Sequence, residues 1–228
     1  MLIIADKKIP EDAKNNLRKY GELVFIETKG ITEESISGHP DIFFCKTNDV
    51  LFVAPNLPDF YKDLLIKNKV SFIKGNTSVG MDYPAAASYN AVLNERFYIH
   101  RCDISDSKLL ENCNHLQRVN VRQGFTRCSL LLLKENHYIT SDEGIHKALR
   151  LLSFSGILVN AKDIVLSGQI HGFFGGTCGV YESAVFFTGS LSHYSDGEKV
   201  KLFLKHLGYK IIELSDSPLF DGGSILIV

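Results

Sequence analysis

The feature that most constrains this chain is a recurring order of patterns: two apolar strands, an amphipathic helix and a third strand. The clearest copy lies within residues 128–168, where the apolar runs Ser129–Leu133 and His137–Thr140 are separated by a polar turn. Ser141 and Asp142 predict a helix start, because short side-chain oxygens accept hydrogen bonds from the free N–H groups of a first turn. Gly156 is predicted to stop this helix. The third-strand segments are Ile157–Val159 and Ile164–Leu166.

The same order of patterns recurs elsewhere with different residue letters, which indicates a structural repeat. Helices are expected where apolar residues recur at helical spacing, and strands where short β-branched or aromatic runs occur. The further copies consist of Asp41–Cys45, Val50–Ala54, Asp59–Lys67 and Val70–Ile73; Ala91–Leu93, Phe97–Ile99, Ser105–Leu116 and Arg118–Val121; and Cys178–Tyr181, Ala184–Thr188, Asp196–Leu207 and Tyr209–Leu214.

The two ends of the chain together complete a fifth copy. Ser224–Val228 is an apolar strand without a following hairpin partner, and Leu2–Ala5 is an apolar strand at the start. Helix Glu11–Tyr20 and strand Glu22–Ile26 follow it. Pairing of the first and last strands would close a ring and remove exposed sheet edges. The sequence therefore predicts one α/β domain over residues 1–228, a five-fold pseudo-symmetric propeller closed by its termini.

Composition excludes several classes of protein. The net charge is -1, whereas a nucleic-acid surface normally needs a concentrated basic patch. No apolar run approaches a membrane span, and Met1–Lys8 is too short and too soon charged for a signal peptide. The five cysteines form no C-x-x-C pair and no histidine has ligand spacing to one of them, so we expect reduced cytoplasmic thiols, no metal and no cofactor.

Chemistry is expected where the repeats meet, because loops on a rigid scaffold carry most sites. The segments that lead into each first strand are rich in polar and reactive side chains. Since these segments start equivalent strands, their side chains are predicted to cluster around one central pocket for a small polar or cationic molecule. The candidate residues are His39, Asp41, Asn90, Arg127, Cys128, His171, Cys178, Asp216 and Asp221.

The predicted ring resembles the pentein fold of guanidino-group-modifying enzymes. The motifs His39–Ile42, Gln123–Ser129, Thr140–Asp142, Gly175–Gly179 and Ser215–Leu219 are similar to an uncharacterised bacterial family of that fold. The resemblance implies a small-molecule site at the centre of the ring. It also implies a cysteine nucleophile in the last unit, a histidine, and carboxylates that grip a guanidinium group.

Residue by residue, the resemblance assigns cation binding to Asp41 and places His171 in the loop of the family histidine. The last strand has no cysteine, and Ile227 falls about where the nucleophile would be. Cys178, which lies between Gly-Gly-Thr and Gly179, is the substitute nucleophile, with His171 as its acid and base.

Structural alternatives stand beside these roles. Cys178 and Cys128 can simply pack at the start of buried strands, and Asp41 can pair internally with Arg127. His39, Asn90, Asp216 and Asp221 can cap or pin turns.

These patterns leave two hypotheses. The first is a hydrolase or transferase that acts on a C–N bond of an amidine or guanidine, with Cys178, His171 and Asp41 as its working residues. The second is a non-catalytic member that kept the ring as a ligand- or protein-binding module. The missing C-terminal cysteine favours the second, and the polar residues gathered at one end of the ring favour a ligand site.

Overall fold

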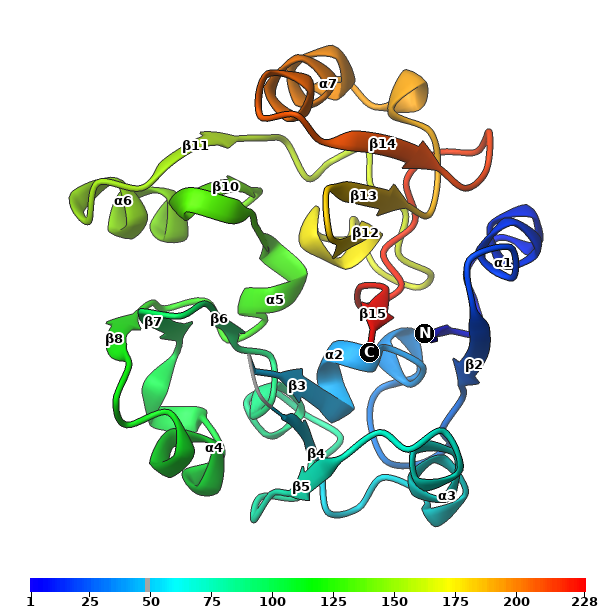
Figure 1. Ribbon diagram of the computed structural model, residues 1–228, viewed down its shortest axis with the longest axis vertical. Coiled ribbons are helices and arrows are strands. Elements are labelled where there is room, and N and C mark those ends of the chain that lie inside the picture. Colours follow the sequence, from blue (N-terminus) through cyan, green and yellow to red (C-terminus); the bar gives the residue numbers. More distant parts are fainter. Residues whose placement is uncertain (48–49) are drawn as a thin grey trace.

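The computed structural model describes residues 1–47 and 50–228, and within these it forms five separate three-stranded sheets. In Figure 1 the five units follow one another clockwise around the centre of the view, each with its helix on the outside. The repeated sheets confirm the α/β class. Closure of the ring as a propeller stays a prediction.

Each sheet has the same topology. Its middle strand pairs antiparallel with the inner strand and parallel with the strand that follows the helix. The strands are β15 (Leu226–Ile227), β1 (Leu2–Asp6) and β2 (Glu22–Ile26); β3 (Phe44–Lys46), β4 (Leu51–Val53) and β5 (Phe72–Lys74); β6 (Val92–Leu93), β7 (Phe97–His100) and β8 (Gln117–Asn120); β9 (Leu130–Leu132), β10 (His137–Thr140) and β11 (Ser155–Leu158); β12 (Cys178–Tyr181), β13 (Ala184–Phe187) and β14 (Lys210–Glu213).

A helix crosses from the second to the third strand of every unit, because parallel neighbours need such a crossover. These helices are α1 (Glu11–Leu17), α3 (Asp59–Lys67), α4 (Ser107–Asn112), α6 (Glu143–Leu151) and α7 (Gly197–His206). Asp142 caps α6 as predicted, since its Oδ1 accepts a 2.7 Å hydrogen bond from the N–H of Ile145. Ile145 and Leu149 form the buried face of this helix.

Short helices lead into several inner strands. They are α2 (Pro40–Phe43), α5 (Thr126–Ser129) and the 3₁₀ turns η2 (Ala85–Ala87) and η5 (Gly175–Thr177). The 3₁₀ turns η1 (Glu34–Ile36), η3 (Cys102–Ile104), η4 (Lys134–Asn136) and η6 (Leu191–His193) lie in other connections. The prediction that Asp41 begins a strand is therefore wrong, because it lies in α2 and β3 starts at Phe44. Pro40 at the first helical position favours that turn, since its φ is fixed near the helical value.

The prediction that Gly156 ends a helix is also wrong. Helix α6 ends at Leu151, and Ser153 makes the turn with a φ of 62°. Gly156 lies in β11, where a Cβ atom would come within 2.4 Å of the Tyr138 carbonyl oxygen. Close approach of β10 and β11 therefore requires the glycine.

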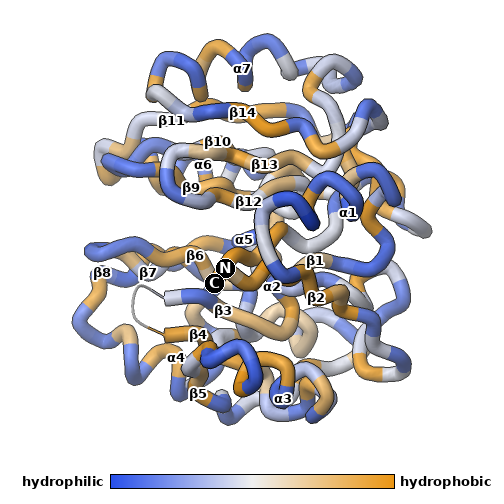
Figure 2. The backbone as a smooth tube through the Cα atoms, turned by 45° about the vertical axis from the view of Figure 1, so that its right-hand side comes forward, coloured by the Kyte–Doolittle hydropathy of each residue, from blue (hydrophilic) through white to orange (hydrophobic). Residues whose placement is uncertain are grey.

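The two termini lie side by side near the centre of both views (Figures 1 and 2). Strand β1 pairs antiparallel with β15, with Ile3 opposite Ile227. The Leu2 N–H donates to Val228 O over 2.8 Å, and the Val228 N–H returns a 2.9 Å bond to Leu2 O. This pairing confirms that the head and tail of the chain share one sheet.

The strands form the apolar interior and the helices shield it. In Figure 2 the strands are coloured mostly as hydrophobic, whereas helix α7 alternates between hydrophilic and hydrophobic residues. No helix in the described ranges is long and apolar enough to cross a membrane. The scaffold positions five inner strands around a central cavity of about 260 Å³, whose walls include residues of β3, β6, β9, β12 and β15.

Candidate functional site

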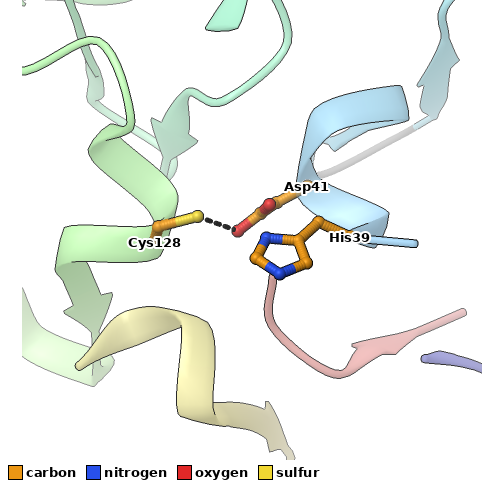
Figure 3. A group of neighbouring side chains, drawn as sticks. All are labelled: His39, Asp41 and Cys128. Carbon is orange, nitrogen blue, oxygen red and sulfur yellow. Dashed lines mark hydrogen bonds between the residues drawn. The ribbon is translucent and has the colours of Figure 1, made fainter. Parts of the chain in front are cut away.

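Three buried side chains from distant segments meet where α2 and α5 face each other (Figure 3). The Cys128 thiol donates a 2.9 Å hydrogen bond to Oδ2 of Asp41. The donor atoms of His39, Asp41 and Cys128 all lie within 4.8 Å of one another. We call this group the thiol–carboxylate cluster. All three residues were candidates from the sequence, and the fold brings them together.

Asn90 holds the two short helices in place. Its Oδ1 accepts from the N–H groups of Arg127 at 2.7 Å and Cys128 at 3.2 Å. Its Nδ2 donates to the carbonyl oxygen of Asp41 over 3.1 Å. Asn90 therefore pins the backbone of the cluster, which is one of the two roles that the sequence left open.

Burial raises the pKa of both acidic groups of the cluster. It raises the pKa of Asp41 to about 6, although the Cys128 hydrogen bond and the charge of Arg127 lower it. Burial, followed by the neighbouring charges of Asp41 and Asp221, holds the pKa of the Cys128 thiol well above its usual range. In the absence of a ligand, the proton therefore stays on sulfur and the carboxylate accepts it as a hydrogen bond.

His39 is 1% exposed, and burial lowers its pKa to about 3, so the imidazole is neutral. Within the described residues neither ring nitrogen makes a hydrogen bond of good geometry, although the backbone of Asp221 lies beside the ring. Nε2 is 3.8 Å from Oδ2 of Asp6. A buried histidine without a firm partner is unusual and suggests that a ligand completes it.

Asp6 belongs to the site although the sequence did not single it out. It ends the buried strand β1 and is 1% exposed, and burial raises its pKa to about 6. In the sequence it was only the first charge after an apolar run. The available signal was the change from apolar residues to a carboxylate at the end of a strand. Because the strand is buried along its whole length, the carboxylate at its end is buried as well.

A cavity of about 350 Å³ opens beside the cluster. The predicted residues on its wall are His39, Cys128, His171 and Asp221, and the aromatic wall residues Phe125 and Phe173 join them. Asp221 accepts from the Phe173 N–H at 2.8 Å and the Gly223 N–H at 3.0 Å. Burial, followed by repulsion from Asp41, nevertheless raises its pKa to about 7.

Cys178 lies apart from this cavity wall. It is 0% exposed, and its Sγ donates weakly to the carbonyl oxygens of Phe174 at 3.6 Å and Gly175 at 3.7 Å. Burial raises its pKa to about 12. His171 instead lies 2.9 Å from the Gly172 carbonyl through Nδ1, and no hydrogen bond links it to Cys178 in the part of the chain that is described. The structure thus does not form the predicted Cys178–His171 pair.

Neither Arg127 nor Asp216 lies on the wall of the cavity beside the cluster, whereas Arg127 and Asp41 both line the central cavity of about 260 Å³. The Arg127 guanidinium donates to the carbonyls of Gly175 at 2.9 Å and Cys178 at 3.2 Å, so it ties the unit of β9–β11 to the unit of β12–β14. The Asp216 side chain is 95% exposed and lies 3.2 Å from His193. It is therefore a surface residue and does not line the cavity.

Comparison with solved structures places the chain in a class of folds. DDAH from Pseudomonas aeruginosa in complex with citrulline has a TM-score of 0.53 at 11% identity, over 94% of this chain and 91% of that one. C. jejuni agmatine deiminase has a TM-score of 0.55 at 15% identity, over 94% and 75%. The amidinotransferase SxtG from Microseira wollei has a TM-score of 0.52 at 11% identity, over 92% and 87%. The chain therefore has the pentein fold of the guanidino-modifying enzymes.

The particular family follows from the sequence comparison. Residues 4–226 match the model of the Family of unknown function (DUF6873), and the chain belongs to that family. No curated protein is significantly similar to it in sequence.

Proposed function

We propose that the chain binds a small amidine- or guanidine-like cation beside the thiol–carboxylate cluster and acts on one of its C–N bonds, as a hydrolase or transferase. The observation that carries the proposal is the 2.9 Å contact between the Cys128 thiol and the Asp41 carboxylate, next to a cavity of about 350 Å³. Cys128 replaces Cys178 as the nucleophile, because only Cys128 combines a carboxylate partner with a place on the cavity wall.

The charges around the cavity favour a cation. Asp221 lies on the cavity wall, and Asp41 and Asp6 lie behind the wall residues Cys128 and His39. Burial raises the pKa of all three carboxyls, so a cation beside them would be favourable. A planar cation would fit, because Phe125 and Phe173 can cover its faces. The agmatine deiminase and the citrulline-bound DDAH share this fold, which supports the same ligand chemistry.

The chemical step can be written with its proton and electron pairs. A bound cation lowers the cost of a nearby anion, so the Cys128 proton passes to Asp41 as sulfur attacks the amidine carbon. The S–C bond forms, the C–N bond breaks, and the leaving amine takes a proton from Asp41. Water or an acceptor amine then attacks the same carbon and returns the electron pair to sulfur. Asp41, which is a carboxylate again after it protonates the leaving amine, accepts the proton of that second nucleophile and returns it to the sulfur of Cys128.

A labelling experiment tests the nucleophile. In metal-free protein we expect iodoacetamide to modify Cys128 faster than Cys178, and a guanidinium compound such as agmatine to slow this reaction. Cys128→Ser should abolish the fast phase, and Cys178→Ser is the matched control that should retain it. Faster labelling of Cys178, or no protection by any guanidinium compound, would contradict the proposal.

A second candidate is a non-catalytic ligand-binding module, and one observation favours it. The last strand, where the fold's nucleophile is expected, contains no cysteine. Calorimetry of agmatine binding separates the two candidates. A binding module would bind equally well with Cys128→Ser and would release no product in either form.

We further propose that residues 1–228 form one domain whose units close as a propeller around the central cavity of about 260 Å³. The pairing of β1 with β15 supports this closure. The five free cysteines support a cytoplasmic location, where thiols stay reduced.

A further inference from the structure

The thiol–carboxylate cluster combines an imidazole nitrogen, a carboxylate oxygen and a thiol sulfur at one buried point. His39, Asp41 and Cys128 are 1%, 3% and 3% exposed, and their donor atoms lie within 4.8 Å of one another. Nitrogen, oxygen and sulfur donors in this combination suit Zn²⁺, whereas Mg²⁺ and Ca²⁺ prefer oxygen alone.

Several of these donors lack partners. Asp41 Oδ1 and both ring nitrogens of His39 make no hydrogen bond of good geometry within the described residues. Burying polar atoms without partners is costly, and native interiors rarely leave them so. A bound cation would supply the missing interaction for Asp41 Oδ1 and for one ring nitrogen of His39.

We propose that His39, Asp41 and Cys128 bind one divalent metal ion of the zinc class, and that the metal-loaded protein is the resting form of the thiol site. The metal site itself stands on the cluster geometry; its resting role rests on the proposed function. On binding, the S–H bond of Cys128 breaks, its proton leaves to solvent, and the sulfur electron pair is donated to the metal. The same pair is then unavailable for attack on carbon.

Asp6 fits the role of the residue that positions the histidine ligand. In Figure 3 one His39 ring nitrogen faces the Asp41 carboxylate and the other faces away. Since Nε2 is the nitrogen 3.8 Å from Asp6 Oδ2, Nδ1 is the one turned toward the metal position. Metal-binding histidines commonly donate their second N–H to a carboxylate, which fixes the tautomer and strengthens the ligand.

The site keeps one coordination position open. Three protein ligands leave the fourth position of a tetrahedral ion to water. His39 and Cys128 both lie on the wall of the cavity of about 350 Å³, so a water ligand would reach the metal from that cavity. The metal can therefore exchange, as a resting form requires.

The metal site is tested with the metal alone. Chelator-treated full-length protein is titrated with Zn²⁺ by calorimetry and with Co²⁺ by absorption spectroscopy. We expect one ion per chain and a thiolate-to-cobalt charge-transfer band. Cys128→Ser should remove the band, His39→Ala should weaken binding at least 100-fold, and Asp6→Asn should weaken it about 10- to 100-fold. Cys178→Ser is the matched control and should bind as the wild type does.

Two results would overturn the site: no Zn²⁺ binding tighter than millimolar, or a cobalt band that persists in Cys128→Ser. Circular dichroism confirms that each variant is folded, and His39→Ala provides the independent second variant. The resting role has its own readout, because Zn²⁺ should slow iodoacetamide labelling of Cys128 at least 10-fold and chelator should restore it. Unchanged labelling at saturating Zn²⁺ would overturn that role. Failure of the proposed function differs, since it shows as an unreactive Cys128 in metal-free protein.

Discussion

Two buried polar regions of this molecule look alike in composition and differ in how well their groups are satisfied. The third unit, which is formed by β6, β7, α4 and β8, contains His100 and Asp106. The thiol–carboxylate cluster contains His39 and Asp41. All four residues are at most 3% exposed. His100 has Ser105 Oγ at 2.5 Å and the Gly124 carbonyl at 2.9 Å, whereas His39 has no hydrogen bond of good geometry among the described residues.

The two carboxylates differ in the same way. Asp106 accepts from the N–H groups of Asn76 at 2.8 Å, Thr77 at 2.6 Å and Leu109 at 3.0 Å. Burial alone would raise the pKa of Asp106, but these donors outweigh it and the pKa is lowered. The pKa of Asp41 is raised. The buried carboxylate of Asp106 therefore holds the neighbouring loops in place, while Asp41 Oδ1 has no hydrogen-bond partner among the described residues.

The largest expected effect is in the satisfied region. Asp106→Asn replaces an acceptor by an NH₂ group that faces backbone N–H donors, so several buried donors lose their partner at once. We expect a loss of about 4 kcal/mol in the free energy of unfolding, measured by urea denaturation at neutral pH. Asp103→Asn, at a carboxylate whose side chain is 62% exposed, is the control and should cost far less. If Asp106→Asn and Asp103→Asn cost the same free energy of unfolding, the buried hydrogen bonds of Asp106 would not be the source of the loss.

A pH series provides the next effect. Burial lowers the pKa of His100 to about 4, below the value of about 6.5 for an unfolded histidine. Below pH 6.5 the unfolded chain therefore binds a proton that the folded chain refuses, so this contribution to stability is present at neutral pH and is lost as pH falls. Between pH 7 and 4.5 the loss should be about 2–3 kcal/mol.

His100→Gln isolates that contribution. Other buried groups, including His39 and the three raised carboxyls, also shift protons in this range and are unchanged in the variant. The wild type should therefore lose more stability on acidification than His100→Gln does, as measured by denaturation at a series of pH values. Parallel curves would show that His100 takes up its proton in the folded state.

The smallest stability effect is expected in the cluster. Asp41→Asn removes a buried charge whose Oδ1 is unsatisfied, so in metal-free protein the free energy of unfolding should change by less than about 1 kcal/mol or increase. The same variant should lose the protection of Cys128 by agmatine, because the carboxylate beside the thiol no longer carries a charge for the cation. Thermal unfolding and labelling on one sample separate the two effects. A loss as large as that of Asp106→Asn would show that Asp41 is a structural residue.

Much of the architecture was predictable from local pattern. Helix α3 has the predicted bounds Asp59–Lys67, and the last strand pairs with the first as its unpartnered position implied. Local pattern failed where a short polar turn precedes an inner strand. The α2 and α5 turns are too short for helical periodicity, so Asp41 and Cys128 were placed on strands.

The candidate site was predictable as a set of positions but not as a set of partners. The structure brings Asp41, Asn90 and Cys128 together as predicted, although Asp41 and Cys128 lie in short helices before the strands, and His39 joins them from the turn before Asp41. The choice of Cys178 with His171 relied on closeness in sequence, yet Cys178 bonds to its own turn. Asp216 follows a strand and was assigned to the pocket, but its side chain points into solvent.

The sequence by itself determined the repeat, because apolar periodicity and helix-start signals are local and occur again in each unit. Only the tertiary structure decided which reactive groups meet, because Cys128 and Asp41 lie 87 residues apart and a hydrogen bond of 2.9 Å depends on how the units pack. It also decided which buried charges are satisfied. Donors for Asp106 come from the neighbouring loop at Asn76 and Thr77, whereas Asp41 Oδ1 and both ring nitrogens of His39 make no hydrogen bond of good geometry within the described residues.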